Sequence, residues 1–118
     1  MVDVIGLSGG KRFELSEANG LVSVIRKFTR DTQKKVDVLS TQASFVPTQE
    51  KKQEIEQALQ RVFDSWCCKV TKLGAIPKGM WLVDFDNGEG YFCWAFPEEE
   101  VEHYHGYDEG FKGRVKLM

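Results

Sequence analysis

The sequence has no long hydrophobic run and no strong excess of charge of either sign. No apolar stretch approaches the roughly 20 residues that a membrane-spanning helix needs, and the first residues lack the cationic and apolar regions of a signal peptide. The formal net charge of the 118 residues is −2 at pH 7, so no overall positive field attracts nucleic acid or anionic lipid. We therefore expect a cytoplasmic protein that binds neither membranes nor nucleic acid.

Cysteine is also scarce. The chain has three cysteines, and two of them are adjacent, as Cys67 and Cys68. Neighbouring residues of a helix point about 100° apart, so an unstrained disulfide between these two is implausible. The sequence is therefore not a disulfide scaffold, and reduced cysteines are typical of small buried residues. No serine or cysteine has an evident base beside it in the sequence, so nothing supports covalent catalysis.

What the chain does contain is ordinary for a globular domain. Hydrophobic residues make up 42% and charged residues 29%. A chain of this length buries roughly two thirds of its unfolded surface, so it can fold without a metal or a disulfide. We expect a single domain over residues 1–118, in which residues 1–10 form a flexible leader.

The first half of the sequence has the periodicity of helices. Ser16 is a candidate N-cap, and the apolar positions after it recur every three or four residues: Ala18, Leu21, Val22, Ile25, Phe28, Thr32, Val36 and Leu39. This spacing predicts a helix from about Glu17 to Leu39 or slightly beyond. Pro47 ends the segment, because the residue before a proline avoids helical geometry.

A second helix is expected to begin after Thr48, which is a good N-cap. Its apolar positions are Ile55, Ala58, Leu59, Val62, Phe63, Trp66, Val70 and Leu73. Gly74 suits the left-handed residue that follows a helix, and Pro77 prevents continuation. Residues 11–74 therefore predict a long antiparallel helical hairpin, with Phe63 and Trp66 among its most buried residues.

After Gly79 the hydrophobic period changes from helical spacing to two. Residues 80–85, 91–96, 101–105 and 114–117 are expected to be strands, and the Asn87-Gly88 pair favours a tight hairpin turn. Residues 75–118 thus predict a three- to four-stranded antiparallel β-meander. The expected fold class is α+β.

Several short motifs occur in a fixed order along the chain: Phe13-x-Leu15-x-Glu17-Ala18-Asn19, Leu82-Val83-Asp84-Phe85, Cys93-Trp94, Glu98, Tyr104-His105, Asp108, Gly110-Phe111 and Gly113-Arg114. With this series the chain resembles an uncharacterised prokaryotic family, domain-of-unknown-function family 2203, from Phe13 to Leu117. The resemblance implies fold and candidate positions rather than a reaction. The chain departs from the family pattern at Ala95, Pro97 and Tyr104, whereas the polar positions match.

The two histidines are two residues apart, as His103 and His105. On a strand they share a face, so both imidazoles could reach one metal ion. A four-residue turn at 97–100 would set Trp94 opposite His103 and Phe92 opposite His105, against an aromatic face. We interpret both histidines as structural residues, with no metal site and no cofactor, because only His105 matches the family motif.

The polar cluster of the C-terminal part supplies the candidate ligand-binding residues, which are Trp94, Glu98, His105, Asp108 and Arg114. A carboxylate that holds an imidazole near a guanidinium can bind an anion or transfer a proton. The same residues can form a purely architectural ion-pair network. We expect the turn over residues 106–113 to bring Arg114 near His105, with Phe111 as its apolar anchor.

Two hypotheses for the function follow. The first is a small non-enzymatic binding or interaction module that acts as a homodimer. Val36 and Leu39 continue the apolar face of the first helix, whereas Gln49–Glu54 opposite them is polar, and exposed apolar surface of this kind marks an interface. The alternative is a small metal- or anion-dependent enzyme or ligand binder that uses the polar cluster. A small anion and a protein are the candidate partners.

Overall fold

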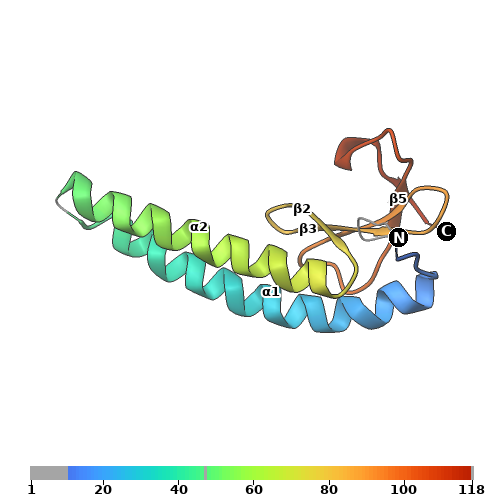
Figure 1. The fold of residues 1–118 in the computed structure, drawn as a ribbon, viewed down its shortest axis with the longest axis horizontal. Helices are drawn as coiled ribbons and strands as arrows, with labels where there is room; N and C mark the ends of the chain where they lie inside the picture. The colour runs from blue at the N-terminus through green and yellow to red at the C-terminus, as the bar shows by residue number, and fades with distance from the viewer. Residues whose placement is uncertain (1–10, 47, 118) are drawn as a thin grey trace, which may run out of the picture.

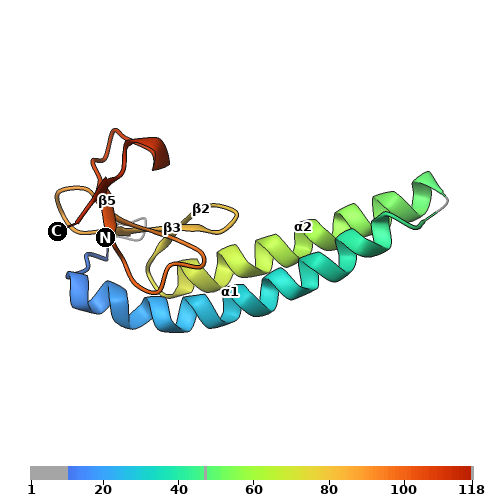
Figure 2. The ribbon, with the colours of Figure 1, turned by 180° about the vertical axis from the view of Figure 1, so that it is seen from behind.

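In the computed structural model, which describes residues 11–46 and 48–117, two helices are followed by a five-stranded antiparallel sheet. The helices lie side by side along the longest dimension of the molecule, and the sheet covers only one end of the pair (Figure 1). The view from behind shows the same arrangement (Figure 2). The extents of 50 × 36 × 25 Å describe an elongated molecule. The expected leader, residues 1–10, lies outside the described residues.

Helix α1 spans Leu15–Ala43 and is longer at both ends than the sequence predicts. Its N-cap is Glu14 and not Ser16, because Glu14 and Glu17 form a capping box. The Glu14 side chain accepts a hydrogen bond from the backbone of Glu17, and Glu17 accepts one from the backbone of Glu14. Such reciprocal bonds satisfy two backbone N–H groups at the helix start. The prediction of Ser16 as the cap is therefore wrong by two residues.

Helix α2 spans Gln49–Lys72 and begins and ends as predicted. The Thr48 side chain accepts a hydrogen bond from the backbone N–H of Lys51, and Gly74 follows the helix with a φ of 92°. No helix within 11–46 or 48–117 is long and apolar enough to cross a membrane. The two helices pack against each other as an antiparallel hairpin.

The sheet contains β2 (Ile76–Gly79), β3 (Leu82–Asp86), β4 (Tyr91–Ala95), β5 (His103–His105) and β6 (Val115–Lys116), in that order across the sheet. The α+β class is confirmed, with one strand more than expected. The extra strand, β2, lies at the edge of the sheet and contains Pro77. An edge strand tolerates a proline, because one side of its backbone makes no hydrogen bonds to a neighbouring strand. The turn between β3 and β4 lies at the predicted position, with Gly88 at a φ of 93°.

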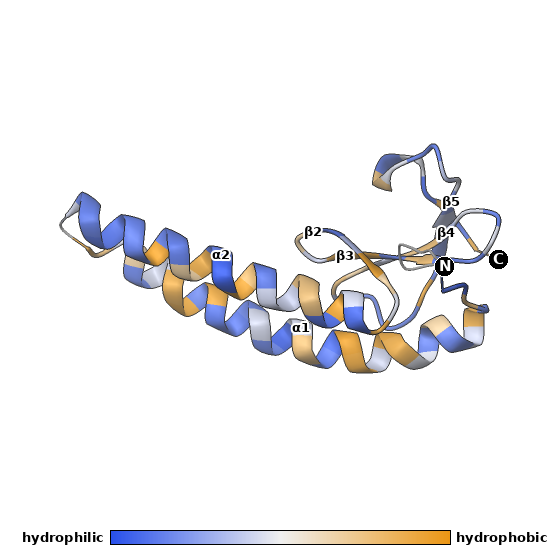
Figure 3. Cartoon of the chain, viewed as in Figure 1, coloured by the Kyte–Doolittle hydropathy of each residue, from blue (hydrophilic) through white to orange (hydrophobic). Residues whose placement is uncertain are grey.

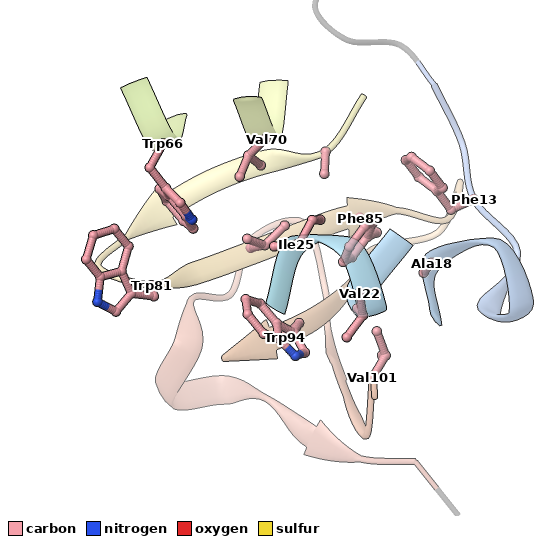
Figure 4. Packing of buried hydrophobic residues seen from close by; sticks show 12 residues of the cluster. Phe13, Ala18, Val22, Ile25, Trp66, Val70, Trp81, Phe85, Trp94 and Val101 are labelled. Atoms are coloured by element: carbon pink, nitrogen blue, oxygen red, sulfur yellow. The ribbon is translucent and has the colours of Figure 1, made fainter. Parts of the chain in front are cut away.

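The core fills the space between the helices and one face of the sheet (Figure 4). Its fully buried side chains include Trp66 of α2, Phe85 of β3 and Trp94 of β4. The indole N–H of Trp66 donates a hydrogen bond to Oγ1 of Thr29, a buried threonine that the predicted face of α1 omits. Trp66 is as buried as predicted. Phe63 is only half-buried, because it lies where the sheet ends and stacks on Trp66 from outside.

The helices continue well beyond the sheet. Trp81, in the turn between β2 and β3, donates a hydrogen bond to Gln33 of α1, and α1 runs ten residues further to Ala43. At 1.5 Å per residue this uncovered arm is roughly 15 Å long. Hydrophobic residues continue on both helices of the arm (Figure 3). The arm thus leaves apolar side chains without cover from the sheet.

Candidate functional site

The register of β4 against β5 decides which face of the sheet carries the histidines. Cys93 pairs with His103 and Tyr91 with His105, so the expected pairing of His103 with Trp94 is wrong by one residue. The connection over residues 96–102 is longer than a four-residue turn, and the backbone N–H of Val101 bonds Oδ1 of Asn19 in α1 before β5 begins. A shift of one residue turns every side chain to the opposite face. The histidines therefore lie on the face away from the helices.

His105 and Asp84 form a buried pair on this face. The Nε2 atom of His105 lies 3.1 Å from each carboxylate oxygen of Asp84, and each side chain is only 3% exposed. The Nδ1 atom of the same ring lies 2.9 Å from the carbonyl oxygen of Gly106. A carbonyl oxygen only accepts hydrogen bonds, so Nδ1 carries a proton and the orientation of the imidazole is fixed.

Cys93 completes a group of three possible metal ligands. A ring nitrogen of His105, the Sγ of Cys93 and a carboxylate oxygen of Asp84 all lie within 4.8 Å of one another, and all three residues are buried. Burial first, and then the charge of Asp84, raise the pKa of Cys93 to about 11, against the opposing effect of Arg114. Burial also raises the pKa of Asp84, against the opposing hydrogen bond and charge of His105. Without a cation, the low dielectric thus disfavours the thiolate and the carboxylate.

The three residues do not have the geometry of a nucleophilic triad. In such a triad the imidazole stands between the carboxylate and the nucleophile, with one nitrogen toward each. Here one nitrogen of His105 faces Asp84 and the other faces the carbonyl of Gly106, so neither is left to take a proton from Cys93. The donor atoms of Asp84, Cys93 and His105 thus converge on one point, and the site does not place a base beside a nucleophile.

Glu98, His103 and Arg114 form a second polar group on the same face. Nη2 of Arg114 lies 3.0 Å from Oε2 of Glu98, and Nδ1 of His103 lies 3.7 Å from the same oxygen. The other oxygen of Glu98 accepts a hydrogen bond from the backbone N–H of Ala95. The sequence placed Arg114 and Glu98 in one polar cluster, and the structure shows that the two side chains are in direct contact. Because the pair is mostly buried, it holds the connection from β4 to β5 against the segment before β6.

The remaining candidates from the sequence lie elsewhere. Trp94 is fully buried on the helix side of the sheet, where its indole N–H bonds the backbone oxygen of Glu98. Asp108 is exposed. Phe111 is 43% exposed and lies under the guanidinium of Arg114, 4.3 Å from it, so it does not anchor the turn in the core. Of the five predicted residues, the structure brings Glu98 and Arg114 into contact and places His105 in the neighbouring group.

A pocket of about 180 Å³ opens above the buried group. The turn that follows β5 folds over the sheet on the side away from the helices (Figure 1). Gly110 and Phe111 of this turn form one wall, and Lys78 and Leu82 form another. Asp84, Cys93 and His105 contribute to the lining of the pocket, although each of them is at most 3% exposed.

Asp84 and Cys93 are the residues of the site that the sequence analysis misses. The sequence contained a signal for Asp84, because this carboxylate stands between two apolar residues, Val83 and Phe85, which the structure shows to be fully buried. A carboxylate in such a strand must face away from the core. The partner was not evident, because Cys93 comes opposite Asp84 only through the pairing of β3 with β4.

The family model of an uncharacterised conserved protein (DUF2203) matches residues 11–117, which is nearly the whole chain. The chain therefore belongs to this family, as the motifs from Phe13 to Arg114 predict. No curated protein and no solved structure matches it. The description of the family assigns no activity, so a function has to be argued from the residues themselves.

Proposed function

We propose that this member of the family is a small non-enzymatic binding module that acts as a homodimer in the cytoplasm. Its cysteines Cys67, Cys68 and Cys93 are free, which agrees with a reducing compartment. The proposal rests mainly on one observation, the apolar groove on the helical arm. The second copy of the chain is the occupant that we assign to this groove.

The groove lies where the arm leaves the sheet and has a volume of about 400 Å³. Its apolar lining comes from Val36 of α1, Leu59 and Phe63 of α2, and Trp81. Trp81 is itself only 7% exposed, whereas Val36, Leu59 and Phe63 are half-buried, and none of the strands within residues 11–46 and 48–117 covers these three. Apolar side chains that are gathered in one open groove are typical of an interaction site.

The groove is also suited to pairing with a copy of itself. Met80 stands at its edge with 59% of its surface exposed. Under two-fold symmetry, Met80 of each copy can enter the groove of the other, so that the same contact forms twice. Methionine is flexible and apolar, which suits it to fill an irregular groove.

A non-enzymatic role agrees with the chemistry of the buried residues. In the metal-free chain both ring nitrogens of His105 lie against acceptor oxygens, and burial is the main cause that raises the pKa of Cys93 to about 11, so neither residue is prepared to act as a base or a nucleophile. The alternative is a small metal- or anion-dependent enzyme or ligand binder that uses the cluster of Glu98, His105, Asp108 and Arg114. It has less support, because Glu98 already neutralises the guanidinium of Arg114.

Light scattering of the purified chain at micromolar concentration tests the dimer. We expect a mass of about twice 13.5 kDa. Met80→Glu should weaken the dimer at least about tenfold, because a charge would have to enter the apolar groove. Val115→Glu is the matched control, since Val115 is similarly exposed at 52% but lies on β6, away from the groove. A mass near 13.5 kDa for the unmodified chain, unchanged on tenfold concentration, would contradict the proposal.

A further inference from the structure

We infer that Asp84, Cys93 and His105 bind a divalent transition-metal ion, with zinc as the expected metal. The inference uses only the sheet of one chain, so it is independent of the proposed homodimer. It also differs from the pairing of His103 with His105 that the sequence suggests, because His103 belongs to the group of Glu98 and Arg114.

The spacing of the donors fits a metal of this size. Nε2 of His105 lies 3.1 Å from the oxygens of Asp84. Two ligand atoms at about 2.0 Å from a tetrahedral zinc ion are roughly 3.3 Å apart. The Sγ of Cys93 lies within 4.8 Å of both other donors. A zinc–sulfur bond of about 2.3 Å in a tetrahedral site places the sulfur roughly 3.5 Å from the other donors, so Cys93 has to move inward by at most about 1.3 Å.

The hydrogen bond of Nδ1, on the far side of the His105 imidazole, also supports a metal ion at Nε2. Because Nδ1 of His105 donates to the carbonyl of Gly106, the neutral ring has its free lone pair on Nε2, which faces Asp84. Histidines that bind metals commonly donate their second N–H to a backbone carbonyl in this way, and the bond fixes the ring for the metal. Nε2 of His105 and the carboxylate of Asp84 need either a shared proton or a cation between them, and the metal ion is the cation that we infer.

The charges also balance around a dication. A thiolate at Cys93 and a carboxylate at Asp84 together neutralise an ion of charge +2, whereas the neighbouring Glu98 and Arg114 neutralise each other. A thiolate is a soft ligand that favours zinc or a similar metal. Magnesium and calcium prefer oxygen ligands, so they are not the expected ions. Three protein ligands leave one position in a tetrahedral sphere, which water from the pocket can fill.

A titration of the metal-free full chain with cobalt(II) tests the inference. We expect one equivalent of cobalt to produce a thiolate-to-metal charge-transfer band, and zinc to displace the cobalt because its affinity for such sites is higher. The decisive variant is Cys67→Ser/Cys68→Ser, which leaves Cys93 as the only thiol of the three in the chain. Both replaced residues lie on α2, outside the site, so the band should persist unchanged.

Two further variants test the other ligands. Asp84→Asn and His105→Ala should each weaken zinc binding at least about tenfold in competition with a chromophoric chelator, whereas His103→Ala should leave the affinity unchanged. Circular dichroism verifies that each variant is folded. The inference is overturned if the band is absent in Cys67→Ser/Cys68→Ser, or if folded Asp84→Asn binds zinc as tightly as the unmodified chain. Should Asp84→Asn fail to fold, the variant with the single thiol decides. The mass measured by light scattering does not bear on either result.

Discussion

Replacing Thr29 by valine tests whether the bond from Trp66 is a structural element of the core. Thr29 and Trp66 are 0% and 1% exposed, and the indole N–H of Trp66 donates to Oγ1 of Thr29 at 2.8 Å. Valine has nearly the shape of threonine, so the substitution leaves no cavity and removes only the acceptor. The indole N–H is then buried without a partner.

The expected cost follows from that burial. An unsatisfied buried donor costs roughly 1–3 kcal/mol, so Thr29→Val should lower the free energy of unfolding by about 2 kcal/mol. With an unfolding entropy of about 2.1 cal/mol/K per residue, this corresponds to a decrease in Tm of roughly 8 °C. Urea unfolding followed by tryptophan fluorescence measures the change, at a fixed protein concentration because dimerisation would add to stability.

Thr32→Val is the matched control. Thr32 is also buried in α1, but its hydroxyl donates only to the carbonyl of Phe28 in the same helix, at 2.7 Å. Its removal leaves no donor without a partner, so the cost should stay within about 0.5 kcal/mol. In a Trp66→Phe background, Thr29→Val should lose most of its effect, because the donor is gone. Equal costs for the two valine variants would refute the reasoning.

Two other predictions concern the sheet. Glu98→Ala should lower the free energy of unfolding in urea by about 2 kcal/mol, because it leaves the mostly buried Arg114 unpaired. Glu99→Ala is the control: its side chain is 84% exposed, so the loss should stay within about 0.5 kcal/mol. Similar losses for the two variants would show that the ion pair of Glu98 with Arg114 is unimportant for stability. Gly90→Ala should cost at least about 2 kcal/mol, because the new Cβ would lie 2.6 Å from the backbone oxygen of His105. Gly110→Ala meets nothing within 4 Å and should be tolerated, so equal Tm values for the two alanine variants would contradict the close approach of the strands.

The sequence by itself determined the helical hairpin and the α+β class. The limits of α2 and the antiparallel succession of the later strands follow from local signals, such as the cap at Thr48, the glycine at position 74 and the change of hydrophobic period after Gly79. These signals act over a few residues, so they can be recognised without knowledge of the rest of the chain. The burial of Trp66 follows from the same periodicity.

Only the tertiary structure decided the composition of the candidate site. Asp84, Cys93 and His105 come from three strands, and their convergence depends on the register of β3, β4 and β5. That register is set partly by contacts from a distant helix, since Asn19 holds Val101 before β5 begins. A shift of one residue would have placed the histidines against the aromatic core, as the sequence analysis expected. A strand alternates with a period of two, so the pattern of each strand fixes which residues share a face, whereas only the pairing of strands fixes which residues meet.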